Sequence, residues 1–82
     1  MLRITQLETA AGAVLRVEGR LAGAWVDELR QAQERHRARS LDLHGLQLAD
    51  GDGLLLLRRF VVDGVELQHL SGYLSALLAE TP

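Results

Sequence analysis

The fold is decided by the stretch Leu41-Asp42-Leu43-His44-Gly45-Leu46-Gln47-Leu48-Ala49-Asp50-Gly51-Asp52-Gly53-Leu54 and the apolar run that follows it to Val62. Leu41 and Leu43 alternate with polar residues, a period of two that predicts a strand with one buried face. Asp50 and Asp52 then predict the start of a helix, because their oxygens can accept hydrogen bonds from its unpaired N–H groups and their charge suits its dipole. A strand that enters a helix through a tight loop is a frequent place for function in α/β proteins.

The segments on either side of this stretch predict an α/β domain. Residues 2–9 and 13–19 alternate like strands, and the turn Ala10-Ala11-Gly12 predicts that they pair as an antiparallel hairpin. Apolar residues at three- and four-residue spacing predict a helix over residues 23–38. A strand over residues 65–70 and a short helix beginning at Ser71 complete the order β-β-α-β-α-β-α. We therefore expect a small four-stranded mixed sheet with about three helices packed on it.

The helix predicted over residues 52–62 has more apolar residues than one sheet can cover. At 100° per residue, the arc facing the sheet contains Leu54, Leu56, Leu57, Phe60 and Val61. Arg58 and Arg59 mark the opposite face, and we expect Leu55 and Val62 beside them to be at least partly exposed. Exposed apolar residues next to a loop of this kind suggest a surface for a partner, although one or two such residues are ordinary in soluble proteins.

Length and composition limit the class of protein. The 82 residues form one domain in this interpretation, residues 1–82, with 48% hydrophobic residues and no cysteine. The net charge of −2 gives no general reason to expect binding to nucleic acid or to anionic membranes. We find no signal peptide and no apolar stretch long enough to cross a bilayer, so the expected location is the cytoplasm.

The order of two motifs resembles the STAS domain family, named for sulfate transporters and anti-sigma-factor antagonists. In that family a strand of the type l-D-l leads through a loop f-D-S-S-G-l into a helix, which is similar to Leu41-Asp42-Leu43 followed by Ala49 to Leu54 here. Upstream, Val17-Glu18-Gly19-Arg20-Leu21 resembles the family's v-x-G-x-L ending of the second strand. The resemblance spans nearly the whole chain and implies the STAS fold and a role in protein interaction.

Two positions depart from the pattern of the family's regulatory members. Gly51 stands where those members carry the serine that a partner kinase phosphorylates, and Asp52 stands at the second serine. Ala22 stands where they tend to carry an acid. Because glycine has no hydroxyl group, we expect no regulation by phosphorylation in this loop. Asp52 is a poor substitute for phosphoserine, since it carries one charge and two oxygens, and we interpret it chiefly as a helix-stabilising acid.

The sequence offers no catalytic or metal-binding pattern. The run from Asp50 to Gly53 resembles the start of a calcium loop, but residues 54–57 supply none of the further oxygen ligands. His44 with Asp42 and the loop acids has no recognisable metal spacing. None of the three serines lies in a nucleophile elbow, and no phosphate-binding glycine motif is present. We therefore expect no enzyme activity, no metal and no cofactor.

The resulting hypothesis is a non-catalytic bacterial interaction module that docks through loop 45–53 and helix 52–62. The expected partner-binding residues are Gln47, Asp50, Gly51, Asp52, Leu55, Arg58 and Arg59. The resemblance implies either a kinase-like anti-sigma factor or the ATPase subunit of an ABC transporter as the partner, and the sequence does not choose between them. The alternative is a homo-oligomeric structural domain, such as a homodimer, or a small-ligand-binding domain of the same fold.

Overall fold

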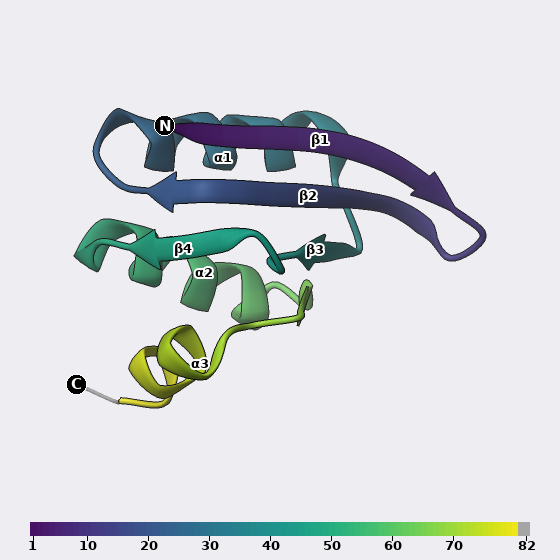
Figure 1. Ribbon diagram of the computed structural model, residues 1–82. Coiled ribbons are helices and arrows are strands. Elements are labelled where there is room, and N and C mark those ends of the chain that lie inside the picture. The colour runs from purple at the N-terminus through teal and green to yellow at the C-terminus, as the bar shows by residue number, and fades with distance from the viewer. Residues whose placement is uncertain (81–82) are drawn as a thin grey trace.

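The structure, a computed structural model, describes residues 1–80. It contains one five-stranded mixed sheet and three helices (Figure 1). In chain order the elements are β1 (Leu2–Thr9), β2 (Gly12–Leu21), α1 (Ala24–His36), β3 (Ser40–Asp42), β4 (Leu46–Ala49), α2 (Gly51–Val62), β5 (Glu66–Gln68) and α3 (Gly72–Ala79).

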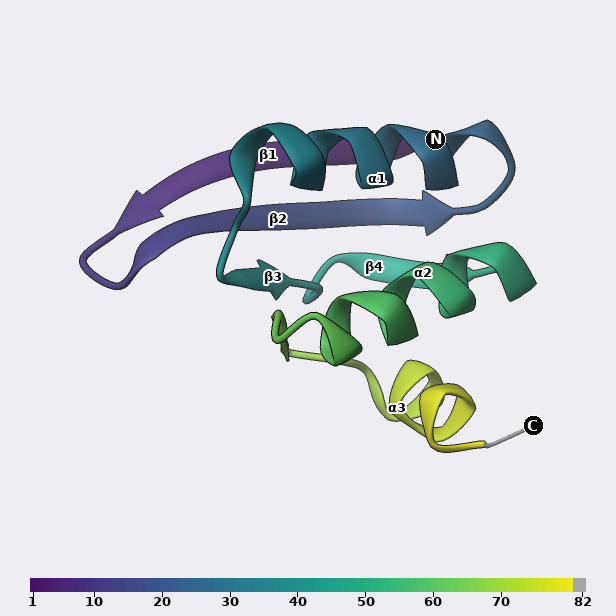
Figure 2. The ribbon, with the colours of Figure 1, turned by 180° about the vertical axis from the view of Figure 1, so that it is seen from behind.

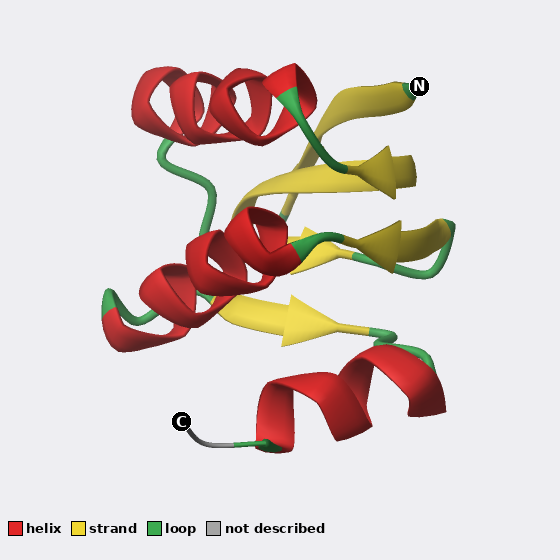
Figure 3. Ribbon diagram, turned by 90° about the vertical axis from the view of Figure 1, so that its left-hand side faces the viewer, coloured by secondary structure: helices red, strands yellow, loops and turns green. Residues whose placement is uncertain are grey.

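The helices leave one face of the sheet uncovered. Figure 2 shows α1 and α2 in front of the strands, and Figure 1 shows the strands from the other side with no helix before them. Figure 3 shows the same two layers edge-on, with α3 at the lower edge of the sheet. The core therefore lies between the sheet and the pair α1 and α2.

The sheet is built around β2. This strand pairs antiparallel with β1 in the predicted hairpin and parallel with both β3 and β4. β3 also pairs parallel with β5, which gives the order β1-β2-β3-β5. The antiparallel hairpin and the parallel pairing of β3 and β5 are as predicted, because the chain reaches β3 through α1 and β5 through α2, and both helices lie on the same face of the sheet.

The sheet has five strands where the sequence predicted four. The backbone turns after β3, where Leu46 N donates to the Leu43 carbonyl, and the chain then returns to β2 as β4. Residues 46–49, predicted as part of the loop 45–53, are therefore a strand. A register shift between Gly19 and Arg20 of β2 accommodates this second parallel partner.

The core is mainly leucine. The side chains that are almost completely buried are Leu15, Val17, Leu21, Leu29, Leu41, Leu43, Leu57 and Leu74. They come from both layers, and Leu74 shows that α3 also contributes to the core. The buried leucines of β3 and of α2 are those expected from the strand and helix periodicities.

The ends of three predicted elements differ from the structure by one or two residues. α1 spans 24–36 and not 23–38, because Arg37 takes a left-handed conformation with φ of 47°. α2 begins at Gly51, one residue before the predicted start. β5 spans only 66–68, and the next residue, His69, also has a positive φ of 60°. His69 is exposed, and its Nδ1 lies 3.0 Å from Asp42 Oδ1.

Candidate functional site

Asp50 connects two loops at one end of the sheet. Its Oδ1 accepts a hydrogen bond of 2.7 Å from the backbone N–H of Gly53, as the N-cap of α2. Its Oδ2 accepts a bond of 2.9 Å from the N–H of Gly23, just before α1. These backbone donors, Gly23 first and then Gly53, lower the pKa of Asp50 below its ordinary value. The predicted N-cap is confirmed, and the carboxylate also holds the two helix starts together.

Gly53 lets α2 approach β2 very closely. A Cβ atom at this position would lie 2.6 Å from the carbonyl oxygen of Leu21 and 3.2 Å from the Cβ of Ala49. Both distances are shorter than an ordinary van der Waals contact. The glycine is therefore required by packing, and the side of α2 that carries it is buried against β2 and β4.

Gly51 and Asp52 occupy the exposed side of the first turn of α2. Both residues are exposed, and a Cβ atom at Gly51 would meet nothing within 4 Å. This position therefore has room for a side chain, unlike Gly53. Asp52 adds a negative charge near the positive end of the helix dipole.

The outer face of α2 carries an exposed apolar stripe. Leu55 is 58% exposed and Val62 is 80% exposed, as the sequence predicted. Arg59 lies beside them with 74% of its side chain exposed, and its Nε is 3.5 Å from Asp63 Oδ1. Val61, which the sequence placed towards the sheet, is 55% exposed. That prediction was wrong because α2 uses a narrower face, centred on Leu57 and Phe60, for the core.

Arg58 is held by the C-terminal helix. Its guanidinium donates hydrogen bonds to the carbonyl oxygens of Leu77, at 3.1 Å, and of Glu80. These carbonyls belong to the end of α3, where a helix leaves carbonyl groups unpaired. Arg58 therefore connects α2 to α3, a contact between residues 19 and 22 positions apart that the sequence did not predict.

Gln47 lies on β4 and is exposed. The structure thus places the seven predicted site residues on one continuous segment, β4 followed by α2. On α2, the positions 51, 52, 55, 58, 59 and 62 all fall within about 60° of Leu55 around the helix axis. We call these α2 positions, with the N-cap Asp50, the α2 surface; Gln47 belongs to the strand that precedes it.

A second polar cluster lies on the uncovered face of the sheet. Asp42 Oδ1 is 3.0 Å from His69 Nδ1 and accepts a 3.0 Å bond from the N–H of His44, and Asp42 Oδ2 is 3.6 Å from Arg16 Nε. The bond to His69 is the main cause that lowers the pKa of Asp42. The alternation of residues 41–44 predicts that Asp42 and His44 share a face, but it gives no signal for Arg16 on β2 or for His69, which follows β5.

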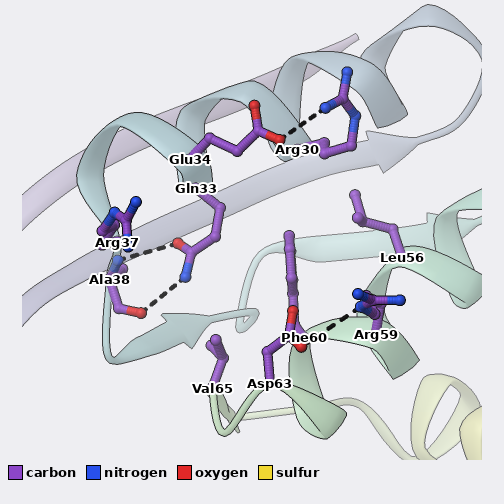
Figure 4. A pocket seen from close by; sticks show the side chains of 10 residues that line it. All are labelled: Arg30, Gln33, Glu34, Arg37, Ala38, Leu56, Arg59, Phe60, Asp63 and Val65. Carbon is purple, nitrogen blue, oxygen red and sulfur yellow. Dashed lines mark hydrogen bonds and ion pairs between the residues drawn. The ribbon is translucent and has the colours of Figure 1, made fainter.

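A hollow of about 670 Å³ lies between α1 and α2 (Figure 4). Leu56, Phe60 and Val65 form its apolar part, and Arg30, Arg37 and Arg59 surround it. Two of these arginines already face acids, since Arg30 pairs with Asp27 and Glu34, and Arg59 pairs with Asp63. The hollow therefore combines an apolar floor with a mixed-charge rim.

Within residues 1–80, no group of three or more His, Asp or Glu side chains is arranged to hold a metal ion. None of the helices in this part of the chain has the length and apolar character needed to span a membrane.

Comparison with known proteins gives a structural match alone. No protein-family profile and no curated protein sequence matches the chain. Among solved structures, the fold is similar to an anti-sigma-factor antagonist, a STAS domain from Rhodobacter sphaeroides, with a TM-score of 0.65. The match covers 83% of this chain and 86% of that chain, at 20% sequence identity. The β-β-α-β-α-β-α order expected from the sequence, with the extra strand β4, is therefore the fold of a STAS domain.

Proposed function

We propose that this chain is a non-catalytic interaction module that docks on a protein partner through the α2 surface. The observation that carries the proposal is the exposed apolar stripe of Leu55 and Val62 along α2, a helix whose N-terminal end is held in place by Asp50. Clustered exposed apolar side chains on a rigid helix are typical of sites where proteins bind one another. The structural neighbour's description as an anti-sigma-factor antagonist supports the same class of function.

Regulation by phosphorylation is not part of the proposed mechanism at this site. Gly51 and Asp52 supply no hydroxyl group at the first turn of α2, so the loop has no phosphoacceptor. Docking then depends on shape, on Leu55 and on the charge of Arg59, and the module is permanently competent to bind. The cytoplasm is the compartment that fits such a partner.

The partner classes that fit the proposal are a kinase-like anti-sigma factor and the ATPase subunit of an ABC transporter. Either protein could bind the exposed face of a helix such as α2. Identifying the bound partner would distinguish the two classes, so the experiment begins by capturing it.

The experiment compares three baits in lysate of the source bacterium: the wild type, Leu55→Asp and Val61→Asp. Leu55 is the centre of the α2 surface, whereas Val61 is equally exposed but lies about 120° away around the helix. We expect a protein that the wild type and Val61→Asp retain and that Leu55→Asp loses. The captured protein is then purified and its Kd is measured by interferometry against each variant.

A rise in Kd of at least about tenfold for Leu55→Asp, with no change for Val61→Asp, supports docking through the α2 surface. Equal affinities for the two variants would overturn it. Asp50 is left unchanged in these baits because its carboxylate holds two loops in place, so its substitution would mix folding with binding.

The second candidate function is binding of a small molecule in the hollow between α1 and α2. The observation in its favour is the apolar floor of Leu56 and Phe60 within reach of Arg37, for which no acidic partner is found among residues 1–80. A thermal-shift screen with amphipathic carboxylates tests it. A rise in Tm that Arg37→Ala abolishes would favour this function over protein docking.

A further inference from the structure

β1 is an edge strand without the usual protection. It is eight residues long, and its pairing with β2 runs without a bulge from Leu2 opposite Gly19 to Thr9 opposite Gly12. Proteins normally protect such edges with lysine, proline, bulges or a covering element, because a free edge can pair with another strand. β1 has neither lysine nor proline, and its charged residues are Arg3 and Glu8 near the two ends of the strand. The other end of the sheet, β5, is only three residues long.

The hydrogen bonds of the hairpin show which backbone groups of β1 face outward. Arg20 N donates to the Met1 carbonyl at 3.0 Å, so Met1 and Arg20 form a hydrogen-bonded pair. Such pairs alternate along an antiparallel ladder, so the odd-numbered residues of β1 bond to β2. The N–H of Gly19, opposite Leu2, instead points away from β1 and bonds to Gly45. Both observations place the N–H and C=O groups of the even-numbered residues at the free edge.

These outward residues are Leu2, Ile4, Gln6 and Glu8. Within the described part of the chain, none of their backbone groups has a hydrogen-bond partner outside β1 and β2. They form a regular row of donors and acceptors over the length of the strand. A partner strand could therefore extend the sheet at this edge.

We propose that a second copy of this chain pairs with β1, antiparallel and centred on Thr5. In this register Leu2 lies opposite Glu8 of the second copy, and Ile4 lies opposite Gln6 of the second copy. Each of the four outward residues then exchanges two bonds, about eight hydrogen bonds in all. Shifting the register by two residues in either direction leaves outward backbone groups unpaired and loses about two of these hydrogen bonds.

The side chains of β1 are compatible with this register. Thr5 faces Thr5 of the second copy, and Arg3 faces Leu7 of the second copy, so no like charges are directly opposite. A register centred on Arg3 or on Glu8 would place two equal charges face to face, which destabilises an antiparallel pair. Because the pairing is two-fold symmetric and uses β1 of both copies, it closes at the dimer. The edges then left free in the described part of the sheet are those of the short strands β4 and β5.

The fluorescence of a tryptophan beside this edge can report on pairing of the two copies. Trp25, the single tryptophan of the sequence, lines a hollow of about 270 Å³ between α1 and β1 together with Ile4 and Gln6. Its side chain is 39% exposed in one copy. The added strand would lie against this hollow, so the fluorescence of Trp25 is expected to shift to shorter wavelength as the dimer forms.

The first test uses charges at the proposed two-fold axis. Sedimentation equilibrium of the full chain from about 1 µM to about 500 µM should show twice the 9.0 kDa chain mass at high concentration. We expect Thr5→Lys alone and Thr5→Glu alone to stay at the mass of one chain, because equal charges then face each other. An equal mixture of the two should recover the dimer mass. Circular dichroism verifies that each variant is folded.

The second test removes one outward donor. Gln6→Pro deletes an N–H group that points away from β2, and Gln6→Ala retains it. We expect the dissociation constant of Gln6→Pro to rise at least about tenfold, with Gln6→Ala close to the wild type. A wild type that stays at the mass of one chain would overturn the proposal. So would a dimer that neither set of variants weakens, because its interface would lie elsewhere. The α2 surface plays no part in either test, so this result and the docking result are independent.

Discussion

Asp50 and Gly23 are 27 residues apart in sequence and are joined by a hydrogen bond of 2.9 Å between Asp50 Oδ2 and the Gly23 nitrogen. The bond fixes the β2–α1 turn against the start of α2. The surface proposed for docking is therefore anchored at its N-terminal end by a side chain that also caps the helix.

Asp50→Ala is expected to lower the free energy of unfolding more than Asp50→Asn does. Alanine removes both acceptors, whereas asparagine retains one carbonyl oxygen and is itself a good N-cap. Urea denaturation of the wild type and both variants at neutral pH measures the order. Equal stability of Asp50→Ala and the wild type would show that the link to Gly23 contributes nothing.

Stability is expected to fall in acid because Asp50 and Asp42 have lowered pKa values. A carboxylate whose pKa is lower in the folded state than its unfolded value of about 3.8 stabilises the fold above that value. The stabilisation is lost as the pH falls through the folded pKa. Urea midpoints between about pH 5 and about pH 2 should decline, and Asp50→Asn should flatten the decline. An unchanged slope in Asp50→Asn would exclude Asp50 as a source.

Gly53→Ala is expected to destabilise the fold by about 1–3 kcal/mol, since its Cβ would overlap the Leu21 carbonyl. Gly51→Ala is the matched control on the same turn. It meets open space and should stabilise by up to about 1 kcal/mol, through better helix propensity. Thermal or urea unfolding of both measures the contrast. A neutral Gly53→Ala would mean that α2 can move away from β2 without cost.

Gly51→Ser is expected to fold normally and to create a phosphoacceptor at the exposed first turn of α2. The open space at Gly51 admits the side chain, and a phosphate there would lie near the positive end of the helix dipole. Incubation with ATP and the captured partner, followed by intact-mass analysis, measures the result. A phosphate on Gly51→Ser and none on the wild type would identify the partner as a kinase.

Arg58→Ala is expected to loosen α3 without unfolding the rest of the domain. The substitution removes the donors to the carbonyls of Leu77 and Glu80, and α3 is a short helix. Hydrogen exchange should become faster in α3 and stay unchanged in β2. Arg59→Ala, which removes an exposed pair with Asp63, is the control and should change neither.

The layers of the fold could be predicted because they follow from local patterns. Alternation in residues 2–9, the apolar stripe of α1 and the acid at Asp50 each act within a few residues. β4 was missed although Leu46-Gln47-Leu48 alternates, because glycine and aspartate on either side favoured a loop over so short a segment. Val61 was misplaced since helix periodicity gives a direction but not the width of the buried face.

The contacts that organise the candidate site are the ones that sequence reasoning could not reach. The bonds from Asp50 to Gly23, from Arg58 to Leu77 and from Asp42 to His69 join residues 19 to 27 positions apart. The periodicity of apolar residues within a helix or strand does not predict which distant residues will form hydrogen bonds. Within the candidate site, the N-cap role of Asp50 and the exposure of Leu55 and Val62 were predictable, because they depend on the local sequence and on the helix angle.

The hairpin of β1 and β2 has a consequence for the order in which the chain acquires structure. Its two strands are joined by a two-residue turn, whereas β3, β4 and β5 reach their neighbours only after a helix or another strand has intervened. Closing short loops is faster than closing long ones, so the hairpin can form first and serve as a template for the parallel strands. A chain leaving the ribosome would therefore complete its edge strand before its core.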